Sequence, residues 1–252
     1  MNCLLVPTLA FDTDLLTRLA NSIDYPIQNK VILNNGKPNA LNAWHRIFPD
    51  WKIIECGRNL GVAASWNQAP KIFTGEDAWL IVNDDFHFQP GQLELICHAS
   101  DNLHTKYPTI HFTVSQGYNC FIWTRKAVNE IGLFDENFYP AYFEDYDYRI
   151  RMQLAGLSPF IVGLNDSEIT HGKPYSGNQR YRELLDAVDR YARDYFTRKW
   201  NHVSDTVDDR TFRTPYNFPN TPLSYWQLDT SMRLYLSNLW HHFINVPNPS
   251  IK

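Results

Sequence analysis

The stretch Trp79-Leu-Ile-Val-Asn-Asp-Asp-Phe-His-Phe88 joins four apolar residues to three polar ones. An apolar run of this length beside turn-forming residues is typical of a strand in the middle of a sheet. In an open α/β sheet, ligands bind outside the carboxyl ends of the strands, where Asp84 and Asp85 would lie. Alternate side chains of an extended chain share a face, so we expect Asn83 and Asp85 to point together. Their oxygen atoms suit Mg²⁺ or Mn²⁺, although Asn and Asp also favour the turn before a helix.

The composition is that of an ordinary globular protein. The 252 residues are 44% hydrophobic and 20% charged, enough for one large α/β domain with or without an extension. A net charge of −4 gives no basic footprint, so we expect no nucleic-acid partner. The four cysteines form no C-x-x-C pair, which favours a reducing compartment over a zinc or disulfide framework. No segment approaches the roughly 18 apolar residues of a membrane span, so we expect a soluble, cytoplasmic protein.

Strand-like and helix-like segments alternate over the first part of the chain, which favours parallel βαβ units with short connections. Besides the stretch at residue 79, the expected strands are Cys3–Pro7, Val31–Leu33, Trp51–Glu55, Thr109–Val114, Asn119–Thr124 and Ile161–Val162. The expected helices are Thr13–Ser22, Leu41–Phe48, Ala63–Phe73, Pro90–Lys106, Arg125–Ile131 and a segment from Glu144 to about Ala155.

A second acidic cluster lies at the start of that last helix. Glu144, Asp145 and Asp147 stand among aromatic residues and precede two arginines. Negative charge is favoured in the first helical turn, and ion pairs with the arginines are a further structural explanation. Three acids are more than capping requires, however, and a carboxylate held beside apolar rings can act as a general base. We therefore interpret this cluster as functional.

The last quarter of the chain changes character. Residues Ser176–Trp200 have the apolar spacing of one long amphipathic helix, whose apolar side we expect to face the sheet. Residues 201–252 are rich in proline and aromatic side chains. This extension is a candidate lid, dimer contact or acceptor platform, and a simpler role is to cover the domain.

Several short motifs follow one another along the chain: Val6–Thr8, Val31–Gly36, the N-x-G-x-x-x-x-x-N segment Asn59–Asn67, Val82–Asp85, Phe134–Phe138 with F-D-E, and Tyr142–Asp147 with E-D-x-D. In this order they resemble the GT-A glycosyltransferases, and among them the large family-2 group of inverting enzymes, over roughly residues 3–176, with Val82–Asp85 in the place of that family's D-x-D. The resemblance implies a GT-A (nucleotide-diphospho-sugar transferase) fold, an α/β fold whose central, mostly parallel mixed sheet is flanked by helices. The catalytic domain would span residues 1–200, with a nucleotide-sugar half to about residue 88 and an acceptor half from 89, followed by the helical or irregular extension 201–252.

The same resemblance implies roles for individual residues. Asp145 would be the base and Glu144 would orient the acceptor or share its proton, while Asp85, with His171 as a further ligand, would hold Mn²⁺ or Mg²⁺. Asn83 replaces the first acid of D-x-D, so the metal is assigned chiefly to Asp85. The nucleotide side would be lined by Thr8, Asn34, Asn35, Arg58, Asn67, Asn83, Asp84 and Lys173.

The implied activity is transfer of a sugar from a nucleoside-diphosphate sugar, preferably a UDP-sugar, to a glycan, glycoprotein or glycolipid hydroxyl. A nucleotidyltransferase is the nearest rival, but it needs a Gly-rich basic loop after the first strand, which Pro7–Asp12 does not provide. A non-catalytic carbohydrate-binding protein would have no use for the Glu144–Asp145 pair. The sequence leaves the nucleobase, the acceptor and the oligomeric state open.

Overall fold

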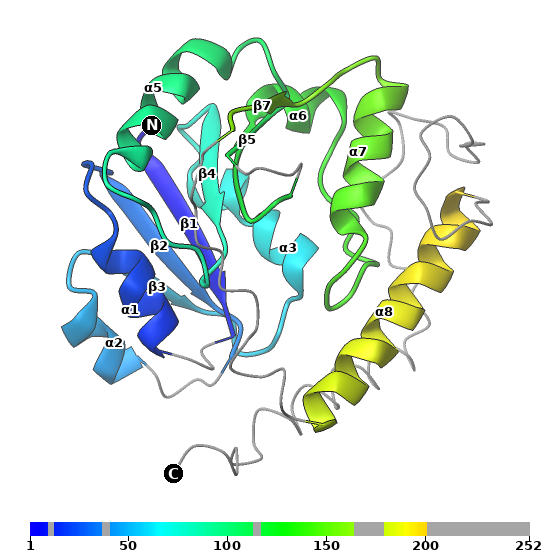
Figure 1. The fold of residues 1–252 in the computed structure, drawn as a ribbon, viewed down its shortest axis with the longest axis horizontal. Helices are drawn as coiled ribbons and strands as arrows, with labels where there is room; N and C mark the ends of the chain where they lie inside the picture. Colours follow the sequence, from blue (N-terminus) through cyan, green and yellow to red (C-terminus); the bar gives the residue numbers. More distant parts are fainter. Residues whose placement is uncertain (10–12, 37–40, 113–116, 164–178, 201–252) are drawn as a thin grey trace.

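A seven-stranded mixed sheet lies at the centre of the computed structural model, which describes residues 1–9, 13–36, 41–112, 117–163 and 179–200 (Figure 1). The strands are β1 (Cys3–Thr8), β2 (Asn29–Asn34), β3 (Lys52–Glu55), β4 (Ala78–Val82), β5 (Thr109–His111), β6 (Cys120–Thr124) and β7 (Phe160–Ile161), in the order β3-β2-β1-β4-β6-β5-β7. β1 to β4 are parallel, and only β6 runs antiparallel to its neighbours β4 and β5. The predicted mostly parallel mixed sheet is confirmed.

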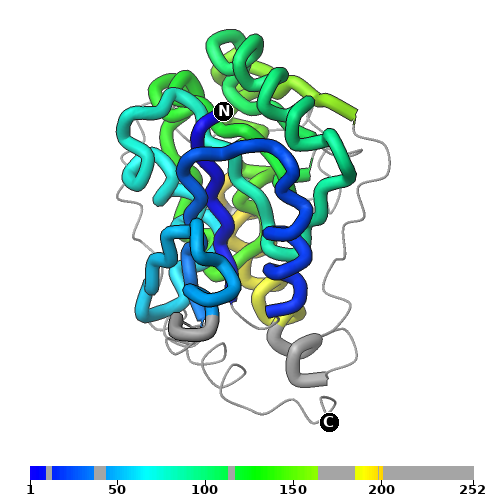
Figure 2. Tube along the Cα trace, turned by 90° about the vertical axis from the view of Figure 1, so that its left-hand side faces the viewer, coloured from blue at the N-terminus to red at the C-terminus, as the bar shows by residue number. Residues whose placement is uncertain are grey.

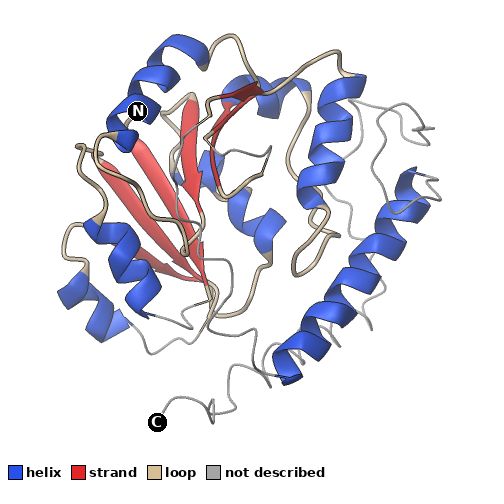
Figure 3. Ribbon diagram, in the orientation of Figure 1, coloured by secondary structure: helices blue, strands red, loops and turns tan. Residues whose placement is uncertain are grey.

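Helices cover both faces of the sheet (Figures 2 and 3). One core contains side chains of α1 (Thr13–Asn21), α2 (Leu41–Ile47) and α5 (Gln92–Leu103). The core on the other face contains side chains of α3 (Val62–Trp66), α4 (Ala69–Ile72), α6 (Arg125–Glu130) and α7 (Glu144–Leu154). The last described helix is α8 (Gln179–Trp200). None of the helices in the described part of the chain is both long and apolar enough to cross a membrane.

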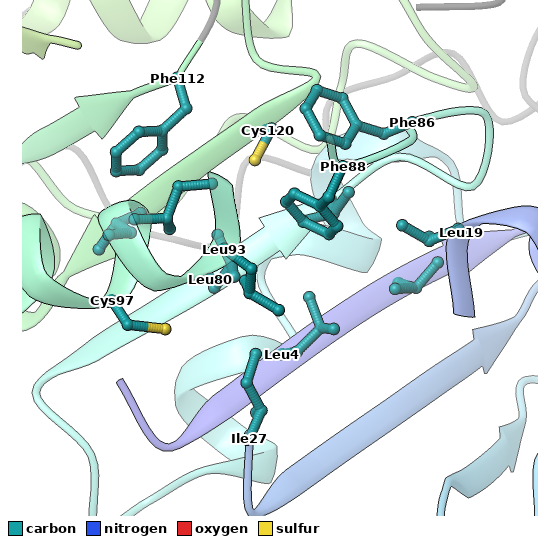
Figure 4. Packing of buried hydrophobic residues seen from close by; sticks show 14 of the residues in the cluster. Leu4, Leu19, Ile27, Leu80, Phe86, Phe88, Leu93, Cys97, Phe112 and Cys120 are labelled. Carbon is teal, nitrogen blue, oxygen red and sulfur yellow. The ribbon is translucent and has the colours of Figure 1, made fainter. Parts of the chain in front are cut away.

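Strand β4 is buried on both sides, which explains its unbroken apolar sequence. Leu80 and Val82 belong to the first core, whereas Trp79 and Ile81 belong to the second. Figure 4 shows Leu80 among side chains of β1 and α5, including Leu4 and Leu93. Alternate residues of a strand point to opposite faces, so a central strand needs apolar residues at every position.

The helix expected over Ala63–Phe73 is two short helices, α3 and α4. Pro70 lies in the first turn of α4, where its missing N–H costs nothing, whereas inside one continuous helix its ring would clash with the preceding turn. The expected start of α5 at Pro90 shifts to Gln92, because Gly91 has a left-handed φ of 78° and ends the preceding turn.

The expectation that the last helix faces the sheet was wrong for its described side chains. Ala192, Phe196 and Trp200 of α8 pack with Phe138 and with Ile150 of α7, in a third core that contains no strand residue. The sheet face on that side is already covered by four helices, so α8 packs against α7 instead, and Figure 1 shows the two helices side by side.

The order of the strands creates a switch point between β1 and β4. From β1 the chain moves outward to β2 and β3, and then returns to place β4 on the other side of β1. The connections on the two sides of such a point diverge and leave a crevice at the carboxyl ends of the strands. Thr8 ends β1, and Asn83 follows β4 directly, so the polar stretch of the sequence stands at this switch point.

Candidate functional site

A row of hydrogen-bonded polar side chains crosses the carboxyl edge of the sheet. Thr8, Asn34 and Glu55 pair in register at the ends of β1, β2 and β3. The Asn34 amide donates to both carboxylate oxygens of Glu55 at 2.9 Å, and the Thr8 hydroxyl donates to Asp84 at 2.5 Å. Four chain segments distant in sequence therefore bring their polar ends together. Glu55 was not among the predicted site residues, although its position as the last residue of a strand at this edge was a usable signal.

The predicted metal-binding tip is a turn, not an extended segment. Phe86 N–H donates to the Asn83 carbonyl at 3.1 Å, so the residues after β4 turn at once. The Asn83 amide group donates to Asn119 at 3.3 Å, on the β6 side, while Asp84 bonds Thr8 on the β1 side. The prediction that Asn83 and Asp85 share one face assumed an extended backbone, whereas the chain forms a turn at these residues. Asn119, which precedes β6, is a second residue that sequence reasoning missed.

Asp85, the predicted metal ligand, is half-buried. Burial raises the pKa of its carboxyl to about 6, because the ionised form loses water. A nearby cation would favour the ionised form, and Asn83, Asp84 and Asp85 together offer the oxygen atoms that Mg²⁺ and Mn²⁺ prefer. Among the described residues, no group of three or more His, Cys, Asp or Glu side chains is placed to hold a metal ion. The other predicted ligand, His171, and the predicted phosphate contact, Lys173, lie outside the described residues.

Two of the predicted nucleotide contacts are used inside the protein. The Asn35 amide donates to Ser65 at 2.8 Å and accepts from Leu60 N–H at 3.3 Å, which ties the end of β2 to the loop before α3. The side chain of Asn67 is fully buried, donates to the Phe134 carbonyl and accepts from Phe134 N–H, both at 2.9 Å. Through these bonds both asparagines hold neighbouring loops in place. Arg58, a third predicted nucleotide contact, is exposed.

The loop before α7 packs tightly against the start of α3. Val62 N–H donates to the Pro140 carbonyl at 2.7 Å, and the Tyr139 hydroxyl donates to the Asn59 carbonyl at 3.1 Å. A Cβ atom on Gly61 would come within 2.9 Å of the Tyr139 ring and 3.0 Å of the Pro140 carbonyl oxygen, so only glycine allows this approach. The N-x-G segment therefore positions the chain that leads into the acid pair.

Glu144 and Asp145 begin α7 immediately after two residues with left-handed backbone. Tyr142 has a φ of 75° and Phe143 a φ of 68°, a conformation that costs energy for residues with a side chain and that clusters at functional sites. Glu144 is 6% exposed, and its Oε2 atom has no hydrogen-bond partner among the described residues. Asp145 is half-buried and accepts from Tyr146 N–H at 2.8 Å.

Both carboxyls of this pair hold their protons more tightly than usual. Burial, followed by the charges of Asp145 and Asp147, raises the pKa of Glu144 well above its ordinary value. Burial also raises the pKa of Asp145, although its hydrogen bond with Tyr146 N–H and the charge of Arg149 oppose the shift. Two neighbouring carboxyls with raised pKa values, one of them with an unsatisfied buried oxygen, are the arrangement expected for proton transfer.

The third acid, Asp147, has a structural role. Its carboxylate is fully buried and bonds Arg151 at 2.9 Å, Lys199 at 2.6 Å and Trp200 at 3.0 Å. The ion-pairing explanation considered for the acidic cluster thus applies to Asp147. That explanation does not cover Glu144, whose Oε2 atom has no hydrogen-bond partner among the described residues.

Tyr118 is a buried residue beside the tip after β4. It stands next to Asn119, which bonds Asn83, and it packs against Trp66 of α3. Burial raises the pKa of the Tyr118 hydroxyl well above its ordinary value, and the charge of Asp145 adds to this effect.

Comparisons with solved structures identify the fold. Glucosyl-3-phosphoglycerate synthase from Mycobacterium tuberculosis, in complex with Mn²⁺, UDP and phosphoglyceric acid, superposes with a TM-score of 0.56 at 10% identity, over 79% of this chain and 78% of that one. The same enzyme with Mn²⁺, UDP-glucose and phosphoglyceric acid gives a TM-score of 0.55 at 13% identity, over 85% and 86% of the two chains. The chain has the GT-A fold of nucleotide-diphospho-sugar transferases.

At the level of sequence, a curated protein from Leishmania donovani described as a galactofuranosyl glycosyltransferase is 32% identical over 133 residues. The matched region is 45% of this chain, and it spans 30% of the length of that protein. No protein-family model matches the chain.

Proposed function

We propose that the chain is a metal-dependent, inverting glycosyltransferase that moves a sugar from a nucleoside-diphosphate sugar, preferably a UDP-sugar, to an acceptor hydroxyl. The observation that carries this proposal is the combination of the polar row at the β1–β4 switch point with the Glu144–Asp145 pair on a GT-A fold. The likeness to a galactofuranosyl glycosyltransferase, and to an enzyme crystallised with UDP and Mn²⁺, supports it.

Asp145 acts as the base in this proposal. The acceptor oxygen attacks the anomeric carbon, the bond from that carbon to the diphosphate oxygen breaks, and the diphosphate leaves with the electron pair. The acceptor proton passes to the Asp145 carboxylate, and a single displacement of this kind inverts the anomeric configuration. Positive charge builds up on the sugar ring in the transition state, as in glycoside hydrolysis. The negative charge of the Asp145 carboxylate would also stabilise this positive charge.

The nucleotide half supplies position and charge compensation. Asp85, with Asp84 and Asn83 beside it, would hold Mn²⁺ or Mg²⁺, and His171 is the further ligand proposed from the resemblance. A bound divalent cation supplies Lewis-acid stabilisation of the charge that develops on the diphosphate. Thr8 and Asn34, at the ends of β1 and β2, would face the nucleoside. Asp84 is held by the Thr8 hydroxyl, so the metal side and the nucleoside side share one hydrogen bond.

The first experiment screens UDP-, GDP- and dTDP-sugars, including UDP-glucose and UDP-galactofuranose, for release of nucleoside diphosphate with Mn²⁺. We expect one nucleotide class to be turned over and its diphosphate to raise the melting temperature in the presence of Mn²⁺, and a chelator to abolish both effects. Asp85→Asn should lose the metal-dependent part of this stabilisation, because an amide binds a divalent cation less tightly than a carboxylate. Asp50→Asn is the matched control, because Asp50 is exposed and precedes β3, at the amino end of that strand and not at the carboxyl ends where the site lies.

Other outcomes would identify the rivals. Release of pyrophosphate from a nucleoside triphosphate and a sugar phosphate would indicate a nucleotidyltransferase. Stabilisation by free glycan without nucleotide or metal would indicate a non-catalytic binding protein. Either result would contradict the proposed transfer.

Glu144→Gln tests whether Glu144 works as a neutral hydrogen-bond donor. Because the folded state raises the pKa of Glu144, ionisation costs the wild type stability as pH rises above the ordinary value of 4.5. The Gln variant lacks this cost, so we expect its melting temperature at pH 8 to equal or exceed that of the wild type. Its amide N–H can still donate, so transfer should fall by no more than about tenfold.

Glu144→Ala is the matched variant, since it removes the donor altogether and should be far less active than Glu144→Gln. If the Gln and Ala variants lose transfer equally, Glu144 acts as a charge or a proton carrier and not as a neutral donor.

A further inference from the structure

Helix α8 contacts the chain on both sides of the acid pair. On one side, the Phe196 ring lies 5.2 Å from the Phe143 ring, and the Arg193 guanidinium lies 5.2 Å from the same ring. On the other side, Lys199 and Trp200 bond the Asp147 carboxylate at 2.6 and 3.0 Å. α8 therefore contacts the chain just before and just after Glu144 and Asp145. Figure 1 shows α7 and α8 side by side.

The polar half of this contact is a buried charge cluster. Lys199 bonds both Asp147 and Asp135, at 2.6 and 2.5 Å, and its side chain is 2% exposed. Asp135 also accepts from the Tyr195 hydroxyl at 2.8 Å and from Asn137, and Arg151 bonds Asp147. Two carboxylates thus face two cations. Burial disfavours the charged form of Asp135, but the Lys199 ammonium outweighs this effect and lowers the pKa of Asp135. Asp135 and Lys199 therefore form an ionised pair.

The apolar half acts on a strained backbone. Phe143 is the second of the two left-handed residues, and its carbonyl accepts from Asp147 N–H at 2.9 Å in the first turn of α7. Such a conformation persists only where surrounding contacts determine it. Phe196 and Arg193 cover the Phe143 ring, and the bonds to Asp147 fix the other end of the same turn. The first turn of α7 is thus held at residue 143 and at residue 147, and the acid pair lies between them.

We propose that α8 is a positioning element for the acid pair, and that Lys199 is the residue through which it holds the start of α7. Lys199 bonds Asp147 and Asp135, and neither carboxylate belongs to the acid pair. Its effect on transfer would pass through Asp147 to the backbone of Glu144 and Asp145. The expected effect on sugar transfer rests on the proposed function. The expected effect on the structure at the start of α7 rests on the contacts of α8 alone.

The test uses Lys199→Met combined with Asp135→Asn. The single Lys199→Met variant leaves two buried carboxylates against one guanidinium and should lose much of its thermal stability. The double variant leaves Asp147 paired with Arg151, so we expect most of that stability to return. Because α8 then loses its ion pair to Asp147 and keeps the Trp200 hydrogen bond, hydrogen exchange should rise in peptides that cover residues 142–148 and stay unchanged in β1 and β4. Turnover should fall by about 10- to 100-fold, with the KM for donor unchanged.

Arg190→Met is the matched control, because it removes a cation of similar length from an exposed position on the same helix. A double variant that folds, keeps wild-type protection at residues 142–148 and turns over at the wild-type rate would overturn the inference. If the wild type transfers no sugar from any donor, the proposed function fails, and protection at residues 142–148 alone then decides whether α8 holds the acid pair.

Discussion

If Asp145 is the proposed base, we expect Asp145→Asn to lower the transfer rate by about 10²- to 10⁴-fold, the usual contribution of a general base, and to leave the proposed binding of UDP and Mn²⁺ unchanged. The amide has the size of the carboxylate, and its oxygen can still accept from Tyr146 N–H, so the start of α7 keeps its structure. It cannot take the acceptor proton. The measurement is single-turnover transfer beside nucleotide-dependent thermal stabilisation, with Asp50→Asn as the control. Normal turnover by Asp145→Asn would remove this residue from the mechanism.

The pH dependence of the wild type provides a second test of the same residue. A base works only when it is deprotonated, so with Asp145 as the proposed base we expect transfer to fall as pH falls through the pKa of Asp145. Because burial raises the pKa of Asp145, the decline should begin above the range of an exposed aspartate, whose pKa is 3.8. Asp145→Asn should lose this part of the profile. An acid limb that persists in the variant would belong to another group.

We expect Gly61→Ala to destabilise the protein more than Gly57→Ala, although both glycines have a left-handed φ, of 83° and 69°. At Gly57 an added Cβ meets nothing within 4 Å, so only the backbone conformation is penalised, by roughly 1–2 kcal/mol. At Gly61 the Cβ would also press on Tyr139 and on the Pro140 backbone, which adds about 1–3 kcal/mol of overpacking. Denaturant unfolding of the two variants measures the difference directly.

Gly61→Ala should also reduce transfer, because the segment that it displaces leads into Glu144 and Asp145. Gly57→Ala should leave transfer close to the wild-type rate. Equal unfolding free energies for the two variants would show that the loop at residues 139–140 yields without cost, and would contradict the tight packing described above.

The elements that local sequence could predict are those whose pattern depends on one packing environment. β4 reads as a strand because both of its faces are buried, and the alternation of strands and helices was enough to predict the parallel half of the sheet. One helix was predicted where α3 and α4 are separate, because the apolar spacing continues across the break. Pro70, in the first turn of α4, was the signal for the break. The side that α8 faces was not predictable, since apolar spacing shows that a face is buried but not what buries it.

The site divides in the same way. Thr8, Asn34 and the residues after β4 could be placed from strand ends alone, because parallel strands end at one edge. The separation of Asp147 from Glu144 and Asp145 could not, because it depends on a lysine that is 52 positions later in the chain, at residue 199, and on Asp135. Asn67 is a similar case, since its amide is held by Phe134, 67 positions away.

The charge cluster beneath α7 also limits how far the protein can be shortened. A fragment that stops before Lys199 keeps Asp135 and Asp147 in the interior with Arg151 as the one remaining cation of the cluster, and it loses the indole donor of Trp200. Expression trials of a shortened fragment should therefore place its terminus after residue 200.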